Sequence, residues 1–243
     1  MPRRSSEIGL KAARAVSPGL HAVLTGDVVG STALDESARA GMGDALRSAY
    51  RAIRDRVGGS VLYPIEVSGG DTWQCYIDDP AIGLGFATCF RALLLAESGI
   101  ETRLVVAIDT IDFLDTGNLG ESDGAAFRRS GRTLRSIGGD TTRIVLPEST
   151  DPLPQLAANI AARSTDYLGR SWTRAQAQSV AHIVGCMLAG ESCSQEEIGK
   201  RWQPNPISQQ AVARHLQSAG WDTLEPTLID FGEIVRQLPP SAP

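Results

Sequence analysis

The chain has 243 residues, a hydrophobic content of 42% and a formal net charge of −5. This length and composition predict one ordinary domain with a small second one, and they exclude global disorder. The negative charge excludes nucleic-acid binding through the surface as a whole, so any such contact needs a local patch.

The composition also predicts the compartment. No uninterrupted apolar run reaches the roughly 18 residues of a membrane span, and the basic start lacks the apolar run of a signal peptide. The cysteines form neither a CxxC pair nor a zinc-type cluster; they are Cys75, Cys89, Cys186 and Cys193. Cys75 and Cys89 stand in apolar runs, as buried thiols do. We therefore expect a reduced, cytoplasmic protein without a membrane partner.

The first part of the chain alternates between strand and helix patterns. Residues 1–19 are expected to form an N-terminal arm, with a helix at 6–16 as one option, and 20–25 predict a buried strand. Helical spacing predicts a helix over 35–57, carried by Met42, Leu46, Tyr50 and Ile53. Strands at 61–67 and 72–77 are expected to form a hairpin around the turn 68–71.

The pattern continues to residue 147. Pro80 opens a predicted helix that ends near Ala96. A strand at 103–108, a helix at 123–137 and a strand at 142–146 follow. The order β-α-β-β-α-β, with a further helix and strand, predicts an α/β sandwich of the ferredoxin-like or palm type over 20–147.

The last part of the chain is predicted to be helical. Three prolines within 147–154 mark a domain boundary, and 148–170 are expected to be a linker with a connector helix. Residues 171–243 are expected to form a small all-α domain. Thr173 is a candidate N-cap, and Ser194 with Glu197 forms a candidate capping box. Ser208 is expected to open the helix over 209–219, and Gly220 is expected to end it.

Two aspartates stand at strand ends next to glycine. Asp27 follows the first strand, and Asp71 ends the hairpin turn. Two carboxylates on neighbouring strands can hold Mg²⁺ ions, which can clamp a triphosphate. Turn chemistry alone also favours glycine and aspartate, so for each residue singly a capping role is the alternative. Only the pair predicts a metal site.

A row of arginines forms the third motif. Arg128, Arg132 and Arg135 are spaced to share one helical face. Guanidinium groups bind phosphate oxygens bidentately, so the row predicts a triphosphate clamp. The alternative is a solvated helix face.

In this order the three segments resemble the nucleotidyl-cyclase homology domain of class III adenylate and guanylate cyclases. Residues 27–32 match its first metal motif, 70–71 its second, and 124–132 the spacing of its catalytic helix. The resemblance implies Mg²⁺ or Mn²⁺ bound by Asp27, Asp71 and the Val28 carbonyl. It implies catalytic roles for Arg132 and Arg128. Nucleotide contacts are implied for Glu121, Gly124, Ser31 and Thr32.

The chain resembles the SatD family more closely. That family is identified here by a Gly-Asp-x-x-x-Ser strand end, a Gly-Asp hairpin, a Gly-x-Ala-Phe helix and a C-terminal helix-turn-helix, over about residues 20–235. Two positions depart from the cyclase pattern, because Val67 replaces a purine-contacting lysine and Arg128 replaces an asparagine. These changes remove the usual contacts for choosing adenine or guanine.

The cyclase resemblance also implies a reaction and an assembly. The ribose 3′-OH would attack the α-phosphate and pyrophosphate would leave, with Arg132 stabilising the charge. In class III cyclases the metal acids and the arginine come from opposite subunits. Catalysis would therefore require a head-to-tail homodimer.

Residues 194–220 resemble a sigma-factor-type or Lux-type helix-turn-helix. Its expected core is Ile198, Val212 and Leu216. The residues expected to face the major groove of double-stranded DNA are Ser208, Gln209, Gln210, Arg214 and His215. Two prolines lengthen the turn, and from residue 171 onward five Lys/Arg face seven Asp/Glu. The alternative is a helical docking or dimerisation module.

Three functions follow from these motifs. The first is a regulator in which a palm domain binds a metal-nucleoside triphosphate and is coupled to a DNA-binding helix-turn-helix. The second is an active nucleotidyl cyclase whose C-terminal helices are only structural. The third is a DNA-binding regulator with a vestigial palm domain. We rank the first highest, because both acids and the arginine row are present.

Overall fold

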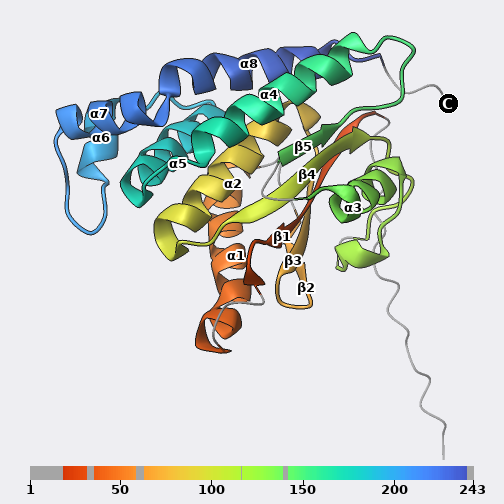
Figure 1. The fold of residues 1–243 in the computed structure, drawn as a ribbon, viewed down its shortest axis with the longest axis horizontal. Helices are drawn as coiled ribbons and strands as arrows, with labels where there is room; N and C mark the ends of the chain where they lie inside the picture. Colours follow the sequence, from red (N-terminus) through yellow and green to blue (C-terminus); the bar gives the residue numbers. More distant parts are fainter. Residues whose placement is uncertain (1–18, 32–35, 59–62, 116, 139–141, 240–243) are drawn as a thin grey trace, which may run out of the picture.

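A computed structural model describes residues 19–31, 36–58, 63–115, 117–138 and 142–239. The predicted N-terminal arm, apart from its last residue, and Thr32 lie outside these residues. Figure 1 shows a sheet with helices on both faces and further helices along one edge. This arrangement confirms the predicted α/β class.

Five strands form the sheet in the order β2-β3-β1-β4-β5. They are β1 (His21–Val28), β2 (Glu66–Ser68), β3 (Thr72–Ile77), β4 (Thr102–Asp109) and β5 (Thr142–Val145). All neighbours are antiparallel except β4 and β5, which are parallel. The predicted strand at 61–67 is wrong in extent, since 63–65 lie outside the ladder. Pro64 has no N–H for strand pairing, which explains the late start of β2.

The two faces of the sheet carry different helices. The helices α1 (Glu36–Val57) and α2 (Gly83–Ser98) cover one face, and α3 (Ala125–Ser136) covers the other. Along β1, Ala22 and Leu24 belong to the large core with α1 and α2, whereas Val23 packs with Phe127 of α3. Strand side chains alternate between faces, so Asp27 lies on the α3 side.

The helix α2 is the core helix of the molecule. It follows a 3-10 turn (Pro80–Ile82) capped by Asp79, as the proline predicted. The segment Pro80–Ser98 is long and apolar enough to cross a membrane by length and composition, but 61% of the window is buried inside the structure. A buried core helix passes the same test, so this segment gives only a weak indication of a membrane span.

The C-terminal helices pack onto the sheet layer. They are α4 (Leu153–Gly169), α5 (Arg174–Leu188), α6 (Gln195–Lys200), α7 (Gln209–Ala219) and α8 (Trp221–Arg236). Most of the predicted linker is α4, which is tied to the sheet because Asp166 pairs with Arg91 (2.6 Å) and accepts from the Thr142 N–H (2.6 Å). Side chains of α2, α5, α7 and α8 share one buried cluster. The apolar core therefore runs across the predicted boundary.

The ends of the C-terminal helices agree with those predicted from local sequence patterns. Thr173 and Ser194 both form capping boxes, Ser208 caps α7, and Gly220 ends α7 with a φ of 78°. Each of these hydroxyl caps accepts a hydrogen bond from an otherwise unpaired N–H of the first turn.

The cysteines divide into two kinds. Cys75 and Cys89 are free and buried, as expected. The expectation of a reduced protein is wrong for the other two cysteines, because Cys186 and Cys193 form a disulfide with their Cα atoms 6.0 Å apart. Gly190 has a φ of 67°, which lets the chain turn back after α5 and bring Cys193 beside Cys186.

Candidate functional site

The predicted acids meet at one end of the sheet. In the strand register Asp27 lies between Thr72 on β3 and Arg103 on β4. The Val28 N–H donates to the Asp71 carbonyl at 3.0 Å, so the hairpin turn is held against the end of β1. The structure thus brings Asp27, Val28 and Asp71 together from two segments.

Arg103 is the nearest charged partner of Asp27. Its Nε donates to Asp27 Oδ1 at 2.6 Å, and its Nη2 donates to Oδ2 at 2.7 Å. A third donor, Nη1, reaches the carbonyl of Ile137 beyond α3 at 2.9 Å. Both side chains are partly buried, with 22% exposure for Asp27 and 30% for Arg103. Bidentate, charge-assisted pairs of this kind are among the stronger polar contacts in proteins.

Our sequence reasoning missed Arg103. The feature that could have revealed Arg103 is its charge on a face of β4 where the alternate residues, Val105 and Ala107, are fully buried. Pairing with Asp27 depends on the β1–β4 register, which joins residues 76 positions apart.

Asp71 has a different environment. Ser31 Oγ donates to Asp71 Oδ2 at 2.7 Å, and Thr72 Oγ1 donates to Oδ1 at 3.4 Å. Gly69 and Gly70 have φ values of 62° and 92°, conformations that favour glycine, so the turn depends on this pair. Ser31, predicted to contact a nucleotide, therefore lies against the second acid.

The glycine before Asp27 has a packing role. The Trp73 indole crosses β1 at Gly26, where an added Cβ would lie 2.5 Å from the ring. The indole Nε1 donates to Thr102 Oγ1 (2.9 Å), which donates to the Asp27 carbonyl (2.6 Å). Trp73 and Thr102 thereby fix the backbone that carries the first acid.

A hollow of about 490 Å³ opens at the same end of the sheet, on the opposite face. It is lined by Val28 and Val29, by α1, and by the turn from Ser98 to Glu101. This volume falls within the range of small-molecule sites. Since the Asp27 side chain points to the α3 face, the hollow receives Val28 but neither acid.

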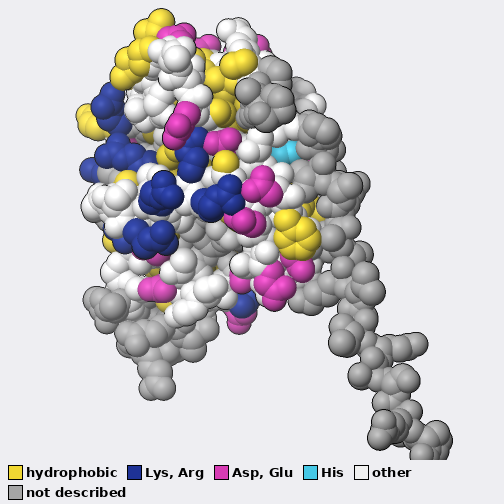
Figure 2. Space-filling model, turned by 90° about the vertical axis from the view of Figure 1, so that its right-hand side faces the viewer, with side chains coloured by type: hydrophobic (Ala, Val, Ile, Leu, Met, Phe, Trp, Pro, Cys, Tyr) yellow, Lys and Arg dark blue, Asp and Glu magenta, His cyan; other side chains and the backbone are white. Residues whose placement is uncertain are grey.

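The predicted catalytic helix starts at the far end of the sheet. Arg128 is exposed and pairs with Asp123 (2.7 Å) and Asp112 (3.2 Å), beyond the end of β4. The hydrogen bond to Asp112, followed by the charge of Asp123, raises the Arg128 pKa. Arg132 is exposed, and no described residue pairs with it. Figure 2, which faces the α3 side of the molecule, shows basic side chains gathered there among acidic ones.

Glu121 and Gly124 lie in the approach to the same helix. Gly124, with a φ of 148°, packs so closely that an added Cβ would lie 2.5 Å from the Ile111 Cα. Glu121 is exposed and accepts from Asn118 Nδ2 at 3.0 Å. The Gly120 N–H donates to Glu66 Oε2 on β2 at 2.6 Å, so the turn that carries Glu121 lies against the hairpin strands. Arg128, in contrast, pairs beyond the far end of β4. Val67, at the lysine position of the cyclase pattern, is partly buried against the core.

The helices α6 and α7 carry the predicted helix-turn-helix residues. The expected core residues are buried together, with exposures of 2% for Ile198, 0% for Val212 and 2% for Leu216. The exposed residues include Ser208, Gln209, Gln210 and Arg214. The connection spans 201–208, longer than the three- or four-residue turn typical of the motif.

His215 does not face outward as expected. Its ring lies 5.2 Å from that of Trp202, and its Nδ1 is 3.3 Å from Ser179 Oγ on α5. Partial burial, with a smaller contribution from Arg214, lowers the His215 pKa. His215 is therefore a packing residue between α7 and α5.

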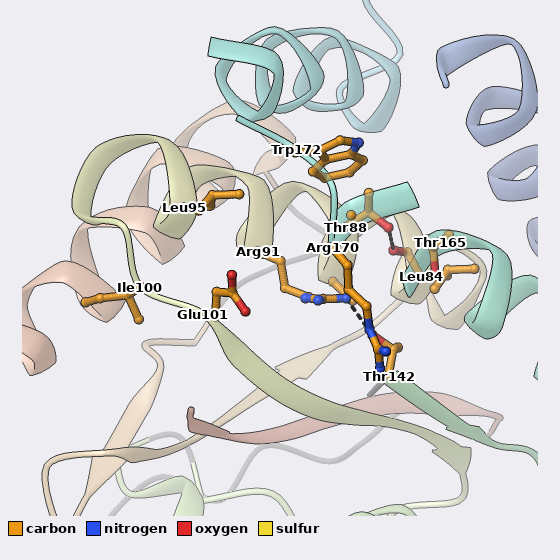
Figure 3. A pocket seen from close by; sticks show the side chains of 12 residues that line it. Leu84, Thr88, Arg91, Leu95, Ile100, Glu101, Thr142, Thr165, Arg170 and Trp172 are labelled. Carbon is orange, nitrogen blue, oxygen red and sulfur yellow. Dashed lines mark hydrogen bonds between the residues drawn. The ribbon is translucent and has the colours of Figure 1, made fainter. Parts of the chain in front are cut away.

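Two further features are structural. The hollow in Figure 3, between α2, β5 and the turn after α4, offers about 20 Å³, roughly the room for one water. Its Arg91 is already satisfied by Thr142 and Asp166. Among the described residues, the one cluster of three metal-type side chains is Cys186, Glu191 and Cys193, whose sulfurs are bonded to each other.

Comparison with known proteins finds similarity to a solved structure but no matching family. No protein-family model matches the chain, and no curated protein matches it. A solved structure of adenylate cyclases from Trypanosoma brucei in their monomeric state is similar over 54% of this chain and 76% of that chain, at 15% identity and a TM-score of 0.40. A likeness at this level supports no conclusion about activity.

Proposed function

We propose that the sheet end carrying Asp27, Asp71 and Arg103 binds a metal-nucleoside triphosphate, and that α6 and α7 form a DNA-binding helix-turn-helix. The chain would then be a nucleotide-responsive regulator. The observation that carries the proposal is the convergence of two acids, a hydroxyl and a guanidinium, from separate segments, on one end of the sheet.

The donor set fits a hard divalent cation. Carboxylates and a backbone carbonyl are the ligands that Mg²⁺ and Mn²⁺ accept, and Asp27, Asp71 and the Val28 carbonyl would supply them. When bound, such an ion would neutralise phosphate charge. Arg103 is matched to the phosphate part of the same ligand. Without that ligand the acid and the guanidinium neutralise each other, which accounts for the Asp27–Arg103 pair.

The proposed DNA contact rests on α7. Ser208, Gln209, Gln210 and Arg214 are exposed at its start and along one side, over a buried apolar core. In Figure 1, α6 and α7 lie on the side of the molecule away from α3.

Two other functions must be distinguished from this proposal, an active cyclase and a vestigial palm domain. Cyclase activity would require a second copy, because the class III resemblance takes the metal acids and Arg132 from opposite subunits, and because Arg128 pairs with Asp112 and Asp123 beyond the far end of β4. A vestigial palm domain is favoured by one observation: Arg103 already neutralises Asp27, as a purely structural ion pair would.

The experiment measures thermal stabilisation of the full chain by each of the four NTPs with Mg²⁺ or Mn²⁺, together with product analysis. At about 100 times Kd a ligand adds roughly 2.7 kcal/mol to the free energy of unfolding. We expect one NTP to stabilise the protein, and we expect Asp27→Asn, Asp71→Asn and Arg103→Met to abolish the effect. Asp55→Asn, an exposed aspartate on α1, is the matched control.

The outcomes separate the three functions. Cyclic nucleotide and pyrophosphate would establish the cyclase. No stabilisation by any NTP would favour a vestigial palm domain.

A separate experiment tests DNA binding with a random-sequence duplex library. It compares the affinity of Arg214→Ala with that of Arg236→Ala, the control at an exposed arginine on α8. Equal binding by both variants would contradict the assignment of α7.

A further inference from the structure

Another hollow lies away from the acids, between the sheet-covering helices and the C-terminal helices. It offers about 500 Å³ and is bordered by α1, α2, α5 and the Gln203-Pro204 segment of the turn between α6 and α7. This size is within the range of metabolite sites and far larger than a packing defect. The sheet-covering helices and the C-terminal helices therefore both contribute to its wall.

The wall is mostly apolar, with one partly buried cation. Ile53, Leu93, Ala96 and Ala181 line the hollow. Arg56 also lines it, and its Nη1 donates to the His182 carbonyl at 3.2 Å and to Cys186 Sγ at 3.7 Å. No described residue accepts a hydrogen bond from Nε or Nη2 of Arg56. Donors of a guanidinium at a cavity wall are free for an anionic ligand group.

The position of Arg56 is set by its surroundings. It packs against Gly185, where an added Cβ would lie 2.7 Å from Nη1. Gly185 thus leaves room for the guanidinium to reach α5. Glu97, the acid of the lining, is largely exposed, and partial burial of its carboxyl group raises its pKa. A carboxylate ligand beside Arg56 therefore meets no fully buried acid.

The hollow also touches the helix-turn-helix. Gln178 Nε2 donates to the Gln203 carbonyl at 3.4 Å, and both residues line the hollow. His182, another lining residue, has its ring 6.4 Å from Trp202, which lies 5.2 Å from His215 on α7. An occupant would thus contact the residues that hold α7 against α5.

We propose that this hollow binds a small carboxylic acid with an apolar body, whose carboxylate pairs with Arg56 and whose body lies against Ile53, Leu93 and Ala96. The site is independent of the proposed nucleotide site, because the two share no residue. Its place between α1, α2 and the α6–α7 turn makes it an effector site.

The test measures binding to the purified full chain by calorimetry, using phenylacetate and octanoate as probes. Phenylacetamide and phenethylamine carry similar apolar bodies without the carboxylate. We expect both acids to bind, and the neutral and cationic probes to bind at least about tenfold more weakly, since charge-assisted hydrogen bonds commonly contribute this much.

Two variants locate the site. Arg56→Gln removes the charge while keeping a donor toward His182, and Ala96→Trp fills the hollow. Each should weaken acid binding by about tenfold or more, whereas Arg51→Gln, an exposed arginine on α1 outside the lining, should leave it unchanged. Absence of binding by both acids, tighter binding of the amine, or binding unaffected by both variants would overturn the proposal. The Trp variant keeps the test decisive if Arg56→Gln fails to fold.

Discussion

At the residue scale, Gly26 is the clearest example of a motif residue explained by packing. Its Cβ position is filled by the Trp73 ring and by the Arg103 carbonyl, 2.5 Å and 2.7 Å away. We predict that Gly26→Ala lowers the free energy of unfolding by about 1–3 kcal/mol, because the ring or the strand must shift.

Urea denaturation followed by circular dichroism measures this change. Gly41→Ala, on the exposed side of α1 with no atom within 4 Å of the added Cβ, is the control. It should be neutral or stabilising by up to about 1 kcal/mol, since alanine is the better helix former. Equal effects of the two substitutions would refute the packing account of Gly26.

The cysteines give a second prediction at this scale. Burial raises the pKa of Cys89 to about 12, and it raises the pKa of Cys75 even further from its ordinary value. We predict that the native protein reacts negligibly with a thiol reagent near pH 8, because only the thiolate attacks and neither sulfur is accessible. Denaturation should expose two thiols, and reduction should expose all four. Four thiols without reductant would contradict the Cys186–Cys193 disulfide.

Asp27, Asp71 and Arg103 show how much of a single site the sequence can predict. Asp27 and Asp71 could be predicted, because each stands beside glycine at the end of a strand pattern. Arg103 could not, because its role depends on β-sheet register, and a shift by one residue would turn it to the other face. The outward position expected for His215 failed for a similar reason, since Trp202 and Ser179 are distant in sequence.

At the scale of elements, α5 carries a pH-sensitive contact. Burial, followed by the charges of Arg56 on α1 and Arg201 after α6, lowers the pKa of His182. When the pKa of a histidine is lower in the folded state, the unfolded state binds the proton more tightly, so protonation favours unfolding. The contribution of His182 to stability is therefore complete above the unfolded pKa of about 6.5 and is lost as pH falls below it.

We predict that the urea midpoint of the native protein falls between about pH 7.5 and about pH 5.5, and that His182→Gln reduces the fall. Because the pKa of His215 is also lowered, part of the fall should persist in this variant. Identical pH profiles of the two proteins would show that His182 is not protonated in this range on unfolding.

Helix ends and helix cores were the elements best predicted from sequence. The capping hydroxyls of Thr173, Ser194 and Ser208 act within three residues, so local pattern was sufficient. The extent of β2 was predicted poorly, because a strand depends on partners and Pro64 blocks pairing just before it. The disulfide was missed because its closing turn follows α5 and leaves no characteristic spacing.

At the scale of the whole molecule, the continuous core decides how the chain unfolds. The composition change at 147–154 predicted two units, yet α5 lies directly on α2. Cys89 Sγ donates to the Ala181 carbonyl at 3.4 Å, and an added Cβ at Gly85 would lie 3.0 Å from Leu188. Small residues on α2 thus admit α5 at close range, and burial of both helices depends on the contact.

We therefore predict that the intact chain unfolds in a single cooperative transition and that a fragment ending at residue 170 has no cooperative melt. Removal of α5 to α8 would expose the apolar side of α2 that they cover, and a domain of this size has only a few kcal/mol of net stability to lose. Thermal melts followed by near-ultraviolet circular dichroism, with the intact chain as control, measure both. A sharp melt of the fragment, or two separate transitions of the intact chain, would mean that the helices form an independent domain and only rest on the sheet layer.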